Sequence, residues 1–303
     1  MTEEEQTKFN QLVQRAHEAF ENDEISKTLD ALEAAYDMDQ TAELNQFVTK
    51  VLLSDGQNQL AHTIADEFVD SYTQTRDLAE QYQEIALRNK HYLIAREFAL
   101  ATKWNTDLEP KIIKQEELDR QEFTQTIQTT ARHFYHLSEG DLGQQQERLT
   151  AAEHLPLREY LVGAKFTLVD PFLLPITRAT VLDRLRRLNI DEQLKMLWFD
   201  GSEIKVNPSK LIALDETPIF KQMMSILEEN EMKIDSTTIQ ALEAGLRLHL
   251  LIAYPKLEDV VKDPQTWVLG MLAETKAEDF KAEPEAQKKI RQQLQAIILT
   301  LMQ

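Results

Sequence analysis

Residues 19–35 read AFENDEISKTLDALEAA, and the pattern of this stretch comes back twice further along the chain. The pattern predicts that one helix ends near Phe20, that the chain turns tightly at Asp23, and that a second helix follows. The apolar positions of the second helix fall on one stripe: Ile25, Leu29, Leu32 and Ala35. Each copy of the pattern is therefore expected to be a helical hairpin.

The chain aligns with itself at a spacing of 33 and then 34 residues. The turn residue is Asp23 in the first copy, Gly56 in the second and Lys90 in the third. A small residue follows five positions later in each copy: Thr28, Ala61 and Ala95. Repeats of this length are typical of helical hairpins stacked in an array. The alternative is an irregular helical bundle in which the spacing arises by chance.

Composition favours an all-α protein. The chain has 303 residues, of which 42% are hydrophobic, so it can bury a large core and its length allows about two domains. Gly and Pro, which interrupt helices, occur only seven and nine times. The chain has no Cys, which excludes disulfides, thiolate metal sites and thiol nucleophiles.

Charge and hydropathy argue against two classes of partner. The formal net charge is −19, which repels the phosphates of nucleic acids and anionic lipids. No apolar stretch approaches the roughly 20 residues of a membrane helix, and the acidic start at residues 1–5 is unlike a secretory signal. We therefore expect a cytoplasmic protein that binds neither nucleic acid nor membranes. The acidity also serves solubility, and that alone could account for it.

The sequence divides the chain into two parts. Residues 1–156 are expected to form degenerate helical repeats, with a long polar helix over 107–137 and a fourth turn near Gly140. Residues 157–303 are expected to form a mostly helical C-terminal domain with helices at 217–229 and 236–253. One β-hairpin is predicted near 194–206, because Asp200-Gly201 between two strand-like runs favours a type I′ turn.

The repeat units resemble tetratricopeptide repeats. The small residue between the two helices of such a repeat falls on Ala16, and the turn and second-helix positions match the residues aligned above. The tryptophan and glycine early in the first helix and the closing proline are missing. The order of elements runs from these repeats through the stretch PFLLP at 171–175 and the hairpin at Trp198 to the run RLHLLIAYP at 247–255 and Trp267. This order is similar to uncharacterised tetratricopeptide-repeat proteins of Gram-positive, Firmicutes-type bacteria. That resemblance implies a fold and a cytoplasmic setting, and it transfers no catalytic residue.

A search for chemistry finds few candidates. His133 and His136, with Glu139 one turn on, could share a helix face and hold a metal, but solvated histidines explain them as well. His249 lies in an apolar run, which favours a core histidine over a catalytic one. The arginines at 184, 186 and 187 are expected to pair within the chain. No glycine-rich phosphate loop or nucleophile elbow occurs, so we expect no cofactor and no metal.

The leading functional hypothesis is a non-enzymatic scaffold or adaptor that binds a protein or peptide. The alternative is an enzyme with a site between the repeat array and the C-terminal domain, and a third class, a nucleic-acid regulator, lacks a basic face. In tetratricopeptide arrays the first helix of each unit lines the concave face. That register selects eight partner-binding positions: Phe20, Glu43, Lys50, Leu53, Asp77, Glu80, Glu84 and Leu87.

Residues 1–110 contain 22 acidic and nine basic side chains, a net charge of −13. We therefore expect an acidic N-terminal groove that accepts a basic or amphipathic segment. Phe20, Leu53 and Leu87 would form its apolar floor, and the carboxylates would guide the approach of the partner. The oligomeric state does not follow from the sequence.

Overall fold

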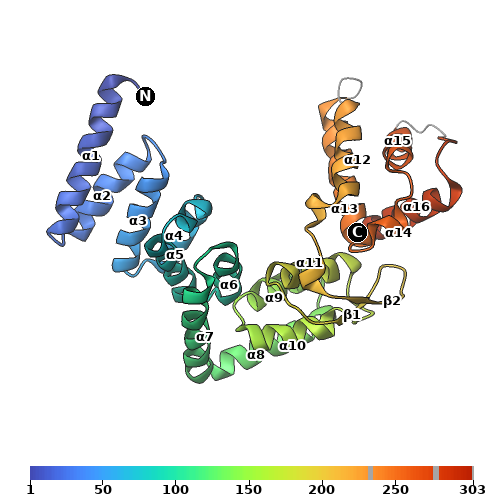
Figure 1. The fold of residues 1–303 in the computed structure, drawn as a ribbon, viewed down its shortest axis with the longest axis horizontal. Coiled ribbons are helices and arrows are strands. Elements are labelled where there is room, and N and C mark those ends of the chain that lie inside the picture. Colours follow the sequence, from blue (N-terminus) through green and yellow to red (C-terminus); the bar gives the residue numbers. More distant parts are fainter. Residues whose placement is uncertain (231–234, 276–279, 302–303) are drawn as a thin grey trace. The chain divides into compact units, whose positions relative to one another are not determined.

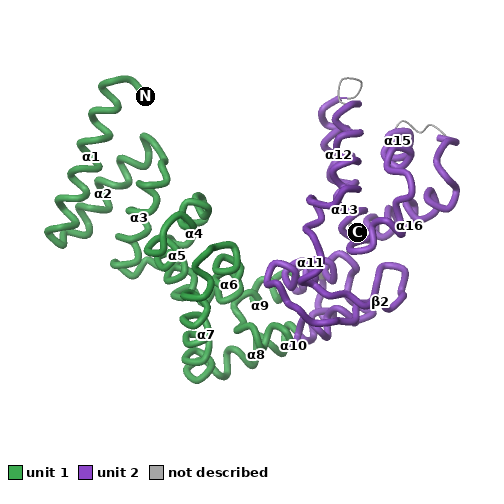
Figure 2. The backbone as a smooth tube through the Cα atoms, viewed as in Figure 1, with its two compact units in different colours: residues 1–134, 146–161 green, residues 135–145, 162–303 purple. Residues whose placement is uncertain are grey.

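The protein is mostly helical, and its described residues contain one two-stranded antiparallel sheet (Figure 1). The computed structural model describes residues 1–230, 235–275 and 280–301. The chain forms two compact units, residues 1–134 with 146–161 and residues 135–145 with 162–303 (Figure 2). The sequence-based boundary at residue 156 lies within the stretch 146–161 of the first unit. No helix in the described ranges is long and apolar enough to cross a membrane.

The N-terminal helices follow one another as hairpins. The helices up to residue 101 are α1 (Glu3–Glu21), α2 (Ile25–Tyr36), α3 (Ala42–Ser54), α4 (Asn58–Asp66), α5 (Arg76–Arg88) and α6 (Tyr92–Ala101). Each packs against the next along the chain, and α3 also contacts α5. Their apolar faces build a shared core that includes Leu32, Val51 and Ile85.

The turns of the three hairpins have the same backbone structure. Asp23, Gly56 and Lys90 adopt φ values of 58°, 76° and 60°. At each turn the amide of this residue donates to the carbonyl three positions back, at 3.0, 3.2 and 2.9 Å. The next amide donates to the carbonyl five positions back, at 2.9 Å in all three hairpins. This pair of bonds is the Schellman motif, which ends a helix through a left-handed residue. The three turns are therefore structurally equivalent.

The small residues selected from the sequence lie at close helix contacts. Ala16, Thr28, Ala61 and Ala95 are all completely buried. Thr28 donates its hydroxyl to the Glu24 carbonyl at 3.0 Å, so its polar atom is satisfied inside the helix. Small side chains at these positions allow neighbouring helices to approach closely.

The second turn is also held by the third hairpin. The Nη1 atom of Arg88 donates to the Leu53 carbonyl at 2.9 Å, and Nδ2 of Asn89 donates to the Asn58 carbonyl at 2.8 Å. Leu53 and Asn58 stand on either side of Gly56. The C-terminal end of α5 therefore closes the loop of the preceding hairpin.

The prediction of a single helix over 107–137 is wrong. Two helices occupy that stretch, α7 (Asn105–Glu122) and α8 (Thr124–Tyr135), with a break at Phe123. Phe123 leaves the helical region at φ −110° and ψ 30°. The Thr124 hydroxyl donates to the Arg120 carbonyl at 2.7 Å. In a continuous helix this carbonyl accepts from the backbone amide of residue 124. Two more helices follow, α9 (Leu142–Ala152) and α10 (Leu157–Thr167).

The second unit combines the hairpin with helices. Its further helices are α11 (Pro175–Arg187), α12 (Pro218–Glu229), α13 (Ser236–Ala253), α14 (Leu257–Val260), α15 (Pro264–Thr275) and α16 (Glu285–Leu301). The helices predicted at 217–229 and 236–253 are confirmed. The strands β1 (Leu194–Leu197) and β2 (Glu203–Val206) pair with Met196 opposite Ile204, and both side chains are buried. The Trp198 indole donates to the Ala253 carbonyl at 2.9 Å, which ties the hairpin to the end of α13.

The predicted type I′ turn is wrong, although the hairpin is present. That turn requires φ > 0 at both central residues, but of the two only Gly201 has it, at 85°. The Gly201 amide donates to the Trp198 carbonyl at 3.0 Å, and the Trp198 amide donates to the Ser202 carbonyl at 2.8 Å. This is a three-residue loop with a bulge at Gly201. The Asp200 carboxylate accepts from the Ser202 amide at 2.9 Å, which favours the longer loop.

A buried ion pair stabilises the C-terminal part of the second unit. Arg291 is 1% exposed and donates to Glu283 at 2.8 to 3.2 Å and to Glu274 at 2.6 Å. Gln287, one turn before Arg291, accepts the amides of residues 262 and 263 at 2.9 and 2.8 Å. These bonds connect α16 to the segments on either side of α15.

Candidate functional site

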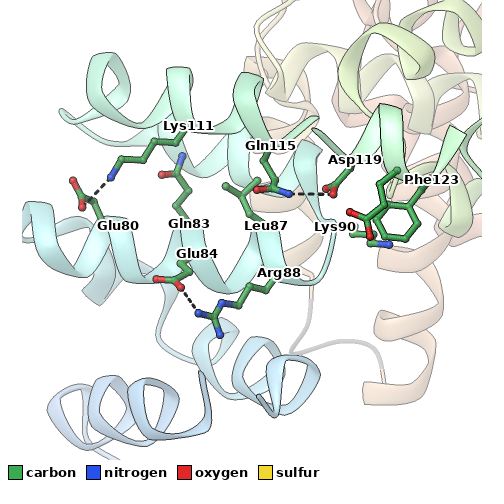
Figure 3. Close-up of a pocket in the computed structure, with 11 residues that line it drawn as sticks. Glu80, Gln83, Glu84, Leu87, Arg88, Lys90, Lys111, Gln115, Asp119 and Phe123 are labelled. Atoms are coloured by element: carbon green, nitrogen blue, oxygen red, sulfur yellow. Dashed lines mark hydrogen bonds and ion pairs between the residues drawn. The ribbon is translucent and has the colours of Figure 1, made fainter. Parts of the chain in front are cut away.

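A polar groove of the first unit lies between α5 and α7 (Figure 3). Its volume is about 530 Å³. Helix α5 contributes Glu80, Glu84 and Leu87 to its wall, and α7 contributes Lys111 and Gln115. Other walls of the groove come from the turn after α5 and from the break after α7. Cavities of this size are typical of ligand sites.

Helical spacing explains why these side chains share a groove. Positions 80, 84 and 87 of α5 lie four and then three residues apart, and so repeat on one face. Positions 111, 115 and 119 of α7 repeat at four residues. The opposite face of α5 is buried in the core through residues such as Ile85, whereas on α7 the buried Leu108 and Ile112 lie beside the groove positions. The polar faces are left along the groove.

Ion pairs neutralise much of the charge in the groove. Glu80 accepts from Lys111 at 2.9 Å and from Arg76 at 3.0 Å. The hydrogen bond from Lys111, and to a smaller extent the one from Arg76, hold the pKa of Glu80 below its ordinary value. Glu84 accepts from Arg88 at 2.6 Å. Across the lining, four carboxylates face three cationic side chains, so the groove is polar and of mixed charge rather than strongly acidic.

The far end of the groove is built around Phe123. The ammonium of Lys90 lies 3.1 Å from the centroid of the Phe123 ring, a cation–π contact. The buried Asp119 accepts from the Tyr92 hydroxyl at 2.5 Å and from the Gln115 amide at 3.1 Å. Glu122 is exposed and makes no ion pair within the described part of the chain. One unpaired carboxylate therefore lies beside an aromatic ring.

The eight positions predicted from the repeat register do not form one surface. Glu80, Glu84 and Leu87 line the α5/α7 groove. Phe20 and Lys50 lie together elsewhere, with the ammonium 5.8 Å from the Phe20 ring centroid, and Phe20 packs edge-on against Phe47 at 5.6 Å.

The remaining positions contribute less. Glu43 and Asp77 are exposed outside the groove. Leu53, predicted as part of an apolar floor, does not line the α5/α7 groove; it is 7% exposed and belongs to the core. Its side chain packs inward at the end of α3, where the third hairpin covers the turn.

The α7 side of the groove was missed from the sequence. The prediction of one helix over 107–137 hid the break at Phe123, and the repeat register was not carried past residue 87. The four-residue spacing of Lys111, Gln115 and Asp119 was a usable signal for a polar helix face.

A chain of three histidines, also missed, lies in the first unit. Nε2 of His62 is 2.9 Å from Nδ1 of His91, and the His91 ring lies 4.5 Å from that of His154. Nδ1 of His62 is 3.2 Å from the Asp66 carboxylate, which also accepts from the Tyr82 hydroxyl at 2.6 Å. Burial, and then the charges of His62 and His154, lower the pKa of His91 to about 4. His91 is therefore neutral near pH 7. No histidine lines the α5/α7 groove.

Two of the histidines considered as candidate functional residues, His136 and His249, make contacts with side chains of this chain. His136 lies 2.7 Å from Glu139, but no group of three or more metal-ligating side chains is found in the described residues. His249 is 1% exposed, and its Nε2 lies 3.1 Å from the Gln295 side-chain oxygen. Burial lowers the pKa of His249 to about 4. It is a core histidine, as predicted.

The arginine cluster pairs within the chain, as predicted. Asp183 accepts from Arg186 at 2.8 Å and from Arg187 at 3.2 Å. Arg184 is 9% exposed and also interacts within the protein. These guanidinium groups are therefore not presented together as a basic surface.

Comparisons with known proteins give no assignment. No protein-family model matches the chain, and neither does any curated protein or any solved structure.

Proposed function

We propose that the protein is a non-enzymatic helical-repeat scaffold that binds a segment of a partner protein in the α5/α7 groove. One observation carries the proposal. Three side chains selected by the repeat register, Glu80, Glu84 and Leu87, line a single groove with the polar face of α7. Grooves between successive helices are the usual binding surfaces of repeat proteins.

The repeat assignment is supported by the turns. The three Schellman turns recur at 33 and 34 residues with the same two backbone bonds, and a completely buried small residue follows five positions after each turn. These features support the resemblance to tetratricopeptide repeats. In that register α5 is the first helix of the third hairpin, and its groove face corresponds to the concave side.

The lining suggests the chemistry of the segment. Leu87 and Phe123 offer apolar contacts, while Glu84 and Glu122 offer exposed carboxylates. Glu122 has no ion pair to give up among the described residues, so a basic side chain placed there gains a partner without breaking one. We infer a peptide with a basic residue beside an apolar one. Because the charges are exposed, its affinity should fall as salt rises.

Selection of peptides from a random phage-displayed library on the purified full-length protein tests the proposal. Peptides that bind should lose at least about tenfold in affinity, roughly 1.4 kcal/mol, when Glu84→Lys and Glu122→Lys are combined. The matched control combines Glu21→Lys and Asp30→Lys, which change the net charge equally on α1 and α2. Both control residues are exposed and lie outside the groove.

Three outcomes would contradict the proposal. One is that no peptide is enriched over an unrelated acidic protein. Another is that the control double variant weakens binding as much as the groove variant, because the protein's net charge would then explain binding. The third is binding that the groove variant leaves unchanged while its melting temperature matches that of the unaltered protein.

A further inference from the structure

A second groove in the first unit differs from the α5/α7 groove in its chemistry. It lies on α2, α3 and α4 and has a volume of about 390 Å³. Its floor is formed by the buried side chains of Leu32 and Leu52, and Leu29 and Ile64 are partly buried beside them. Leu60 is 46% exposed at its edge. Aliphatic side chains from three helices thus line one continuous hollow.

Every charged side chain that lines this groove is acidic. Glu33 and Asp37 are exposed on its rim, and no Lys or Arg contributes to the lining. Tyr36, also in the lining, donates its hydroxyl to Glu67 at 2.5 Å, which holds a third carboxylate close by. The α5/α7 groove, in contrast, contains three cationic side chains.

The end of α2 increases the negative potential at the rim. The carbonyls at a helix C-terminus carry the negative end of the helix dipole, and cations are stabilising there. The last turn of α2 contains no basic residue, and Glu33 and Asp37 lie at that end. Two carboxylates at this position disfavour α2 by itself, and a cationic partner would relieve the repulsion.

We propose that this groove binds an amphipathic helix of a partner protein whose apolar face carries flanking Lys or Arg residues. The apolar face would lie over Leu29, Leu60 and Ile64, and the cations would pair with Glu33 and Asp37. Helices that dock in such grooves use apolar residues at positions i, i+3, i+4 and i+7. The site is separate from the α5/α7 groove and does not depend on the function proposed for that groove.

A designed peptide provides the probe. It has about 18 residues, five helical turns, with Leu at i, i+3, i+4 and i+7 and Lys elsewhere, and carries fluorescein for anisotropy. The comparison peptides are one with Glu in place of Lys and one with the same Leu and Lys in scrambled order. The full-length protein should bind the amphipathic Lys peptide at least tenfold more tightly than either comparison peptide.

Variants locate the binding. Leu60→Asp, and the double variant Glu33→Lys with Asp37→Lys, should each weaken binding at least tenfold. The control Glu21→Lys with Asp30→Lys, and the α5/α7 variant Glu84→Lys with Glu122→Lys, should change the affinity less than about threefold. All the altered side chains are exposed, and melting temperatures should stay close to that of the unaltered protein.

Several results would overturn the proposal. No binding of the amphipathic Lys peptide at concentrations up to about 1 mM would do so, as would equal binding of the scrambled peptide. Equal losses in the Glu33 and control double variants would assign binding to net charge alone. If light scattering finds a dimer that Leu60→Asp converts to a monomer, the occupant is a second copy of this chain rather than a partner helix.

Discussion

The buried His249 should make the second unit less stable in mild acid than at neutral pH. Nε2 of His249 lies beside the Gln295 side-chain oxygen, so the hydrogen-bond network assigns the ring proton to Nε2. Nδ1 is buried and has no hydrogen-bond partner among the described residues. Protonation would place a second proton on that unpartnered atom, in a site that also feels the charge of Arg291. The ring of the folded protein is therefore neutral near pH 7, where a free histidine already begins to take up a proton.

The magnitude follows from the difference in pKa. The pKa of His249 is about 4 in the folded protein, against 6.5 for a free histidine. Between these values the unfolded chain binds more protons than the folded one, so stability falls as the pH drops from 6.5 to 4 and levels off below. One pKa unit corresponds to about 1.4 kcal/mol, so the loss between about pH 7 and pH 4.5 is about 2 kcal/mol.

Urea unfolding of the full-length protein measures this loss. Tryptophan fluorescence reports on the region, because Trp267 lies 6.0 Å from the His249 ring. His249→Gln keeps a side chain that can donate to Gln295 and cannot titrate. The free energy of unfolding of the unaltered protein should fall by about 2 kcal/mol more than that of the variant over the same pH range. Parallel pH profiles for the two proteins would refute the reasoning, whatever the stability of the variant at neutral pH.

Two glycines provide further predictions. Gly201→Val should lower stability by about 1 to 2 kcal/mol in urea unfolding, because a β-branched residue must adopt a φ of 85° there, although no atom lies within 4 Å of the added Cβ; an unchanged midpoint would mean that the loop rearranges freely. Gly270→Ala should cost about 1 to 3 kcal/mol, because its Cβ would lie 2.6 Å from the Glu283 carboxylate and 3.1 Å from the Arg291 guanidinium. Its control is Gly245→Ala, where the nearest atom is 3.5 Å away and the helix should gain up to about 1 kcal/mol; equal effects of the two alanines would contradict this account.

Local signals in the sequence identified turns and periodic helices. Asp23 and Lys90 were aligned with Gly56 through the spacing alone, and all three adopt the left-handed conformation. Such turns are determined within a few residues, since the Schellman bonds connect groups close in sequence. The β-hairpin was found for the same reason. Its loop type was missed because the Asp200 carboxylate bonds the Ser202 amide, a choice that the Asp-Gly pair does not reveal.

Contacts between residues far apart in the sequence could not be predicted from the periodic pattern of apolar residues. The break at Phe123 has no Gly or Pro to announce it. Lys111 was not expected to neutralise Glu80, because the two residues come from different helices. Similarly, His62, His91 and His154 are far apart in sequence and meet only through packing. The α5 side of the α5/α7 groove was therefore implied by the resemblance to tetratricopeptide repeats, and the α7 side required the tertiary structure.

The hydrogen bonds from Arg88 and Asn89 to the second turn make the row of hairpins asymmetric, because a later hairpin holds the turn of an earlier one. If residues are removed from the N-terminus as far as α2, the hydrogen bonds from Arg88 and Asn89 still hold the Gly56 loop. A chain that ends after α4 would instead expose the carbonyls of Leu53 and Asn58 to water. No hydrogen bond from α3 clips the Asp23 turn in the same way, within the described residues. Proteases and hydrogen exchange should therefore reach the first loop before the second, and the hairpins should open from the N-terminus inward.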